Sequence, residues 1–91
     1  MKKIALIQTD SCVSCISLEH EVLSVMDKFK EVSLSVYRTQ EEAQEIVDKY
    51  QVEKLPSLLL LDNDQLLGQV TGYQPAFILE VWLENLLKEG R

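Results

Sequence analysis

The order in which two hydrophobic periodicities alternate along the 91 residues constrains the fold more than any other feature. Short apolar or alternating runs predict four strands, at 3–9, 32–37, 58–61 and 66–70. Apolar residues spaced three and four apart predict three helices, at 15–30, 41–50 and 76–88, and in the first of these Glu19 and Glu21 fall on the solvent side. The resulting order, βαβαββα, gives a parallel pair of strands followed by an antiparallel pair. It predicts an α/β fold with a four-stranded mixed sheet and helices on both faces.

Length and charge limit the classes of protein to which the chain can belong. Because domains cluster at roughly 100–150 residues, we expect a single domain over residues 1–91. The net charge is −6 with only nine Lys and Arg, so a nucleic-acid phosphate surface is not expected. The apolar run near the start is too short for a signal-peptide core or a membrane span. We therefore expect a cytoplasmic protein that does not enter a membrane.

The two cysteines, Cys12 and Cys15, lie three positions apart at the start of the first predicted helix. A disulfide that closes so short a loop restrains the unfolded chain little, so in a reducing compartment the pair indicates catalysis or metal binding. With Ser11 as the helix cap, Cys12 lies in the first turn, where free N–H groups and the helix dipole favour a thiolate. We expect Cys12 to attack a substrate disulfide and Cys15, buried one turn further, to resolve the mixed disulfide.

Three motifs follow the first strand in an order that is typical of one family. They are the Cys-Val-Ser-Cys sequence at 12–15, Leu55-Pro56 before a hydrophobic strand, and Thr-Gly-Tyr-Gln-Pro at 71–75 before the last helix. In order and separation they resemble the thioredoxin superfamily over nearly the whole chain. The extra N-terminal strand and helix of ordinary thioredoxins are missing, so the chain resembles the minimal thioredoxin-like core. The predicted strand at 32–37, with only one face well buried, accordingly lies at a sheet edge.

The resemblance implies a thiol-disulfide oxidoreductase that reduces or exchanges protein disulfides and needs neither a cofactor nor a metal. Its electrons would come from a reductase or from glutathione. The resemblance also implies a cis Leu55-Pro56 bond, whose exposed backbone would pair with an extended substrate, and it places Gly72 in the same groove. The predicted substrate-binding residues are Val13, Ser14, Leu55, Pro56 and Gly72.

Two departures from the family pattern bear on the chemistry. Ser11 replaces the usual Trp before the first cysteine, which leaves the redox potential and the choice of partner open. Leu6 stands where thioredoxins carry a buried Asp, so Cys15 lacks the family's proton acceptor. Asp10 could substitute in part, although its charge opposes a nearby thiolate.

Other readings of the same residues remain open at this stage. One is a thioredoxin-fold interaction module with little catalysis, and another is a glutathione-dependent, glutaredoxin-like protein. A metal carrier is a third, but His20 lies about 12 Å from Cys12 along a helix and is expected to face solvent. The helix at 76–88 has more apolar positions than one stripe needs, which fits deep packing or a dimer contact. We expect a monomer or a weak dimer.

Overall fold

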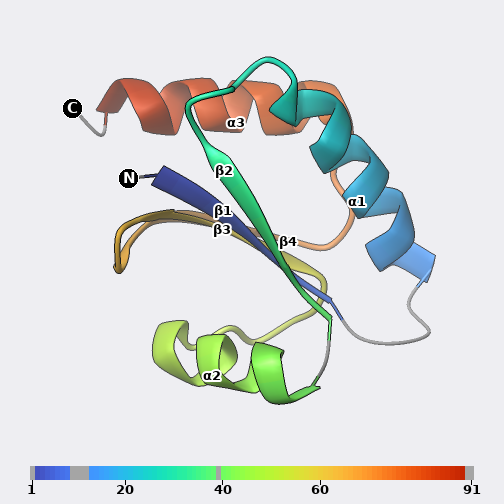
Figure 1. Ribbon diagram of the computed structural model, residues 1–91. Coiled ribbons are helices and arrows are strands. Elements are labelled where there is room, and N and C mark those ends of the chain that lie inside the picture. Colours follow the sequence, from blue (N-terminus) through green and yellow to red (C-terminus); the bar gives the residue numbers. More distant parts are fainter. Residues whose placement is uncertain (1, 9–12, 39, 90–91) are drawn as a thin grey trace.

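The computed structural model describes residues 2–8, 13–38 and 40–89, with the element order βαβαββα that the sequence predicts (Figure 1). The strands are β1 (Lys2–Ile7), β2 (Ser33–Tyr37), β3 (Ser57–Asp62) and β4 (Gln65–Thr71). The helices are α1 (Val13–Met26), α2 (Gln40–Tyr50) and α3 (Ala76–Glu89).

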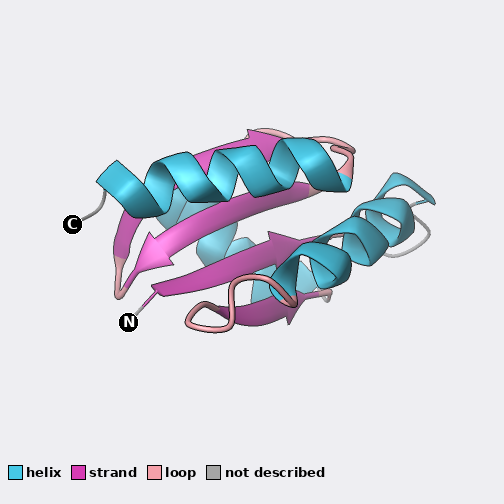
Figure 2. Cartoon of the chain, turned by 90° about the horizontal axis from the view of Figure 1, so that it is seen from above, coloured by secondary structure: helices cyan, strands magenta, loops and turns pink. Residues whose placement is uncertain are grey.

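The four strands form one mixed sheet in the order β2-β1-β3-β4, which confirms the predicted sheet and the edge position of β2. β1 is parallel to β2 and antiparallel to β3, and β3 continues into β4 as a hairpin. Asn63 in the hairpin turn has a φ of 57°, a conformation that Asn tolerates better than most residues. Helices α1 and α3 cover one face of the sheet and α2 covers the other (Figures 1 and 2).

The central strands β1 and β3 are buried on both faces, which explains their nearly uninterrupted apolar runs. Successive side chains alternate between the two faces of a sheet. On the side of α1 and α3 the buried strand residues are Ile4, Leu6, Leu58 and Leu60. On the side of α2 they are Ala5, Ile7, Leu59 and Leu61. The sheet thus separates a larger hydrophobic cluster from a smaller one.

Several predicted boundaries differ from the structure, most clearly the ends of α1 and β1. α1 ends at Met26 rather than at Lys30, although Phe29 is still buried. The N–H groups of Lys28 and Phe29 donate to carbonyls three residues back, and these tight turns carry Phe29 into the core. β1 ends at Ile7, two residues before the predicted end. The predicted helix cap Ser11 lies outside the described residues.

α3 combines a buried stripe with an exposed apolar patch. Leu79 and Leu83 are almost fully buried, whereas Phe77, Ile78 and Val81 are exposed. The helix is therefore packed against the sheet, as expected, and its surplus apolar residues face outward. None of the helices in the described ranges has both the length and the apolar character needed to span a bilayer.

Candidate functional site

The strand register brings the predicted site residues of β3 and β4 to one end of the sheet. Ile7 of β1 is aligned with Tyr37 of β2 on one side and with Ser57 of β3 on the other, and Ser57 is aligned with Thr71 of β4. Pro56 directly precedes this row and Gly72 directly follows it. The chain also leaves β1 at this end to enter α1 (Figure 1). The cysteine-bearing helix and the two predicted binding loops therefore start from the same end of the sheet.

Pro56 and Gly72 are joined by a backbone hydrogen bond. The Gly72 N–H donates to the Pro56 carbonyl at 2.8 Å, and the predicted cis bond between Leu55 and Pro56 is confirmed. Gly72 has a φ of 75°, which glycine adopts without steric cost, and a Cβ there would meet nothing within 4 Å. Pro56 is buried, while Leu55 is 38% exposed. Their roles as substrate contacts stay predictions.

Cys15 lies in the first turn of α1 and is completely buried, as its place on the apolar stripe predicts. It packs on the same helix face as Leu18 and Val22, and its sulfur is disulfide-bonded rather than a free thiol. Cys12 lies outside the described residues. Val13 and Ser14 open the helix, but their side chains lie outside the described part as well.

Glu19, which the periodic pattern assigns to the solvent side of the helix, fastens α1 to the ends of β1 and β2. Its carboxylate accepts hydrogen bonds from both the Gln8 amide, at 2.6 Å, and the Arg38 guanidinium, at 2.9 Å. Gln8 is only 6% exposed. Glu19 is half-buried rather than fully exposed, because the helix lies close enough to the sheet end for these side chains to meet.

Glu21, also assigned to solvent, fastens the opposite flank of α1 to the loop that contains Gly72. Its carboxylate accepts the N–H of Ala76, the first residue of α3, at 2.9 Å. The first turn of α3 has no acidic residue of its own, so Glu21 supplies the anion that a helix N-terminus favours. The pKa of Tyr73 is raised, first by partial burial and then by the neighbouring Glu21 carboxylate, with which Tyr73 also forms a hydrogen bond. In the sequence, the only sign that α3 needs an acceptor from elsewhere is that it begins after Pro75 with no acidic residue in its first turn.

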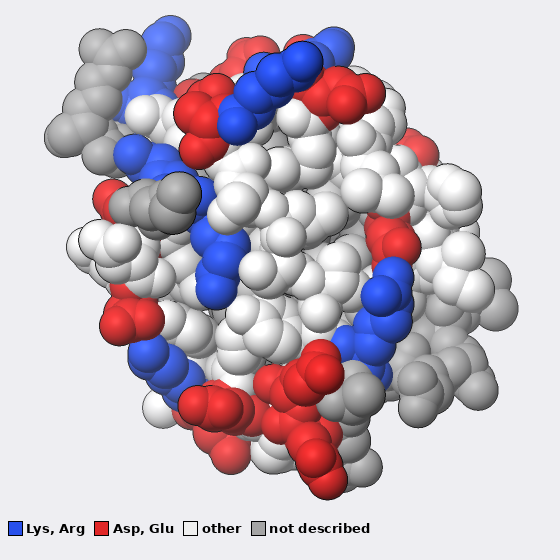
Figure 3. All heavy atoms as spheres, viewed as in Figure 1, with Lys and Arg blue, Asp and Glu red and all other residues white. Residues whose placement is uncertain are grey.

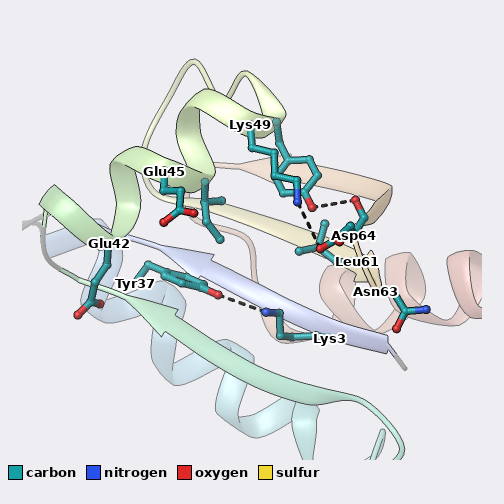
Figure 4. A pocket seen from close by; sticks show the side chains of 10 residues that line it. Lys3, Tyr37, Glu42, Glu45, Lys49, Leu61, Asn63 and Asp64 are labelled. Atoms are coloured by element: carbon teal, nitrogen blue, oxygen red, sulfur yellow. Dashed lines mark hydrogen bonds and ion pairs between the residues drawn. The ribbon is translucent and has the colours of Figure 1, made fainter.

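Two surface hollows lie near these elements. One, of about 190 Å³, lies between α1 and the ends of β1 and β2 and is lined by Gln8, Ile16, Glu19, His20, Leu23 and Arg38. His20 is exposed, as predicted. The other, of about 290 Å³, lies under α2 and contains none of the predicted site residues (Figure 4). The ammonium groups that line this hollow already have partners. Lys3 contacts Tyr37 Oη at 3.2 Å, and Lys49 contacts Asp64 at 3.3 Å.

Metal ligation was the alternative chemistry for the cysteines. Within 2–8, 13–38 and 40–89, no three His, Cys, Asp or Glu side chains are grouped so that they could hold a metal ion.

The fold and the convergence of α1, Pro56 and Gly72 at one end of the sheet define a thioredoxin-fold α/β protein. The model of the thioredoxin-like domain family matches residues 1–87, and the chain belongs to that family. No curated protein matches the sequence.

Solved structures of thioredoxins share the fold at low sequence identity. A thioredoxin of Trypanosoma brucei brucei is similar with a TM-score of 0.79 and 23% identity, over 97% of this chain and 76% of its own. Oxidised mitochondrial thioredoxin 3 of Saccharomyces cerevisiae has a TM-score of 0.76 and 19% identity, over 92% and 77%. A malarial protein matches with a TM-score of 0.79 and 17% identity, over 96% of this chain and 98% of its own.

Proposed function

We propose that the protein is a thiol-disulfide oxidoreductase that works through Cys12 and Cys15. The observation that carries the proposal is the position of Cys15, completely buried and disulfide-bonded in the first turn of α1. Cys12 is the chain's only other cysteine. A resolving cysteine needs this kind of position, since it must stay protected until a mixed disulfide forms next to it.

The reaction consists of two exchanges. The Cys12 thiolate attacks one sulfur of a substrate disulfide, so that a mixed disulfide forms and the other substrate sulfur leaves as a thiolate that takes up a proton. Cys15 then loses its proton and attacks the Cys12 sulfur, which releases the second substrate thiol. The protein ends with one internal disulfide, and the substrate has gained two electrons and two protons. Leu6 is buried and apolar, so it cannot accept the Cys15 proton.

The substrate class follows from the loops at the same end of the sheet. The exposed Leu55 and the Gly72 backbone flank the hydrogen bond between Gly72 and Pro56, and an extended peptide can pair with backbone at such a position. Together with Val13 and Ser14 they form the proposed binding surface for protein disulfides. The proposed setting is the cytoplasm, with a reductase or glutathione returning the electrons.

The test is reduction of a protein disulfide, with insulin as substrate and dithiothreitol as electron source. We expect the native chain to reduce insulin faster than dithiothreitol alone, and Cys12→Ser to lose this activity. Cys15→Ser should trap substrate as a mixed disulfide through Cys12, whereas Cys12→Ser should not trap it. Trapping by Cys12→Ser alone would reverse the two roles.

The same assay separates the oxidoreductase from an interaction module. A rate equal to the background, unchanged in Cys12→Ser, would contradict the proposal and favour binding without catalysis. Titration in glutathione redox buffers then tells whether the pair is poised as a reductant or as an oxidant.

A further inference from the structure

The outer edge of β2 is an open hydrogen-bonding edge. β2 pairs only with β1 in the sheet that the described residues form. It lies nearest the viewer in Figure 1, and no other described element lies in front of it. Its residues Ser33–Tyr37 contain no charged residue and no proline, the two devices that most often block an exposed strand edge.

The opposite edge of the sheet is β4, and its irregular backbone protects it from pairing with another strand. In the β3–β4 pairing, Leu60 is aligned with Gly68 and Leu61 with Leu66, so Leu67 is an extra residue that forms a bulge. A bulge disturbs the regular spacing of outward N–H and C=O groups and discourages a further strand. The β2 pairing with β1 is regular over its whole length. β2 is therefore the edge on which another strand can be added.

The direction of the free backbone groups follows from one printed hydrogen bond. The Gln8 N–H of the β1 end donates to the Tyr37 carbonyl at 3.0 Å, so the Tyr37 backbone points toward β1. Backbone groups of successive strand residues point to alternate sides. Ser35 therefore also points inward, and Leu34 and Val36 present their N–H and C=O groups outward.

The outward N–H and C=O groups of β2 are complementary to those of a second β2 strand related by a two-fold rotation. If a second β2 runs antiparallel with Ser35 opposite Ser35, Leu34 of each copy lies opposite Val36 of the other. Both residues of each such pair point outward, so each pair exchanges two N–H···O bonds. Leu34 and Val36 lie on the face of the larger hydrophobic cluster, so aliphatic side chains meet aliphatic side chains.

The surface around β2 also favours a second copy of the chain as the partner. In Figure 3, viewed as in Figure 1, charged side chains lie mainly around the rim, and a broad uncharged area fills the centre over β2. We propose that two copies of the chain associate through their β2 strands, antiparallel about Ser35, into one continuous eight-stranded sheet. Only five residues of each copy form the strand contact, so the dimer is weak. Each copy carries a net charge of −6, so added salt strengthens it.

Disulfide crosslinking tests the register directly. In a Cys12→Ser, Cys15→Ser background, Ser35→Cys should form a covalent dimer on oxidation, because directly opposed residues in a non-hydrogen-bonded pair lie about 4.5 Å apart between Cα atoms. Ser33→Cys is the matched control, since its two copies lie about 13 Å apart in this register. We expect crosslinking to be several-fold faster for Ser35→Cys than for Ser33→Cys. Equal rates would overturn the proposal.

A second test keeps both native cysteines and does not depend on thiol exchange activity. Ser35→Lys and Ser35→Glu each place like charges opposite one another, so each should sediment as a monomer at concentrations where the native chain associates. Mixing the two variants should restore a dimer of one copy of each. A native chain that stays monomeric, or a dimer unaffected by Ser35→Lys, would refute the β2 interface.

Discussion

The two flanks of α1 are fastened to the sheet end in different ways, although the carboxylates that do it are only two residues apart. On one flank Glu19 binds two side chains, Gln8 and Arg38. On the other, Glu21 binds the N–H of Ala76 and the Tyr73 side chain. The Glu19 contacts to Gln8 and Arg38 span 11 and 19 residues, and the Glu21 contact to Ala76 spans 55.

The difference indicates which flank depends more on its carboxylate. The Gln8 end of the first flank is also tied to α1 by the short covalent connection between β1 and the helix. The loop with Gly72 has no such short connection to α1, so Glu21 and the apolar packing between α1 and α3 hold the two together. Glu21 also fills the role of a helix cap, because its acceptor satisfies an N–H at the start of α3. We expect the Glu21 flank to be the more sensitive one.

The largest effect in this comparison is expected for Glu21→Ala. The change removes the acceptor of a helix N-terminal N–H and should lower the free energy of unfolding by about 1–2 kcal/mol. Urea denaturation followed by circular dichroism measures it. The control is Glu84→Ala, which removes an exposed glutamate of α3 itself. A loss no greater than that of Glu84→Ala would contradict the capping role.

Glu19→Ala should cost less, about 1 kcal/mol, because one hydrogen bond to the buried Gln8 amide is lost while Arg38 can turn to water. The same denaturation experiment gives the value. Glu19→Gln separates charge from hydrogen bonding, since it keeps an acceptor for Gln8. If Glu19→Ala destabilised the protein more than Glu21→Ala, the proposed ranking of the two flanks would be reversed.

Most of the fold could be predicted from the sequence because its signals are local. The period of two in β2, the unbroken apolar runs of β1 and β3, and the stripe of α2 each report how one element is buried. The cis bond before Pro56 was implied by the resemblance to the thioredoxin superfamily rather than by a local signal. Helix ends were less accurate, since Phe29 continues the apolar stripe of α1 and is buried, but reaches the core through turns beyond the helix end.

The polar contacts around the site could not be predicted in the same way. Glu19 and Glu21 stand at positions that any amphipathic helix gives to water, and nothing in a 3.6-residue pattern tells whether a sheet end or a loop lies within reach. Their partners come from residues 11 to 55 positions away. Such contacts require the relative placement of whole elements, which local periodicity does not encode.

A smaller effect is expected for Arg38→Ala on the Glu19 flank. The Arg38 side chain is 59% exposed and Glu19 is 25% exposed, so solvent screens this pair. The loss of stability should be about 0.2–1 kcal/mol and should shrink as salt is added. The double variant with Glu19→Ala should lose less than the sum of the single losses, because each single change already breaks the pair. Additive losses would show that the two residues do not interact in solution.

The smallest effect concerns the ionisation of Tyr73 on the Glu21 flank. Its pKa lies above the ordinary value of 10.0, first because of burial and then because the Glu21 carboxylate opposes a phenolate. A raised pKa means that the folded chain holds the phenolic proton more tightly than the unfolded chain. The stability this provides is therefore present below pH 10 and is lost as the pH rises through the folded-state pKa. Carbon-13 NMR of labelled tyrosine, assigned with Tyr73→Phe, measures the titration. Glu21→Gln should move the Tyr73 pKa down toward its ordinary value. An unmoved Tyr73 pKa would show that the carboxylate does not reach the phenol.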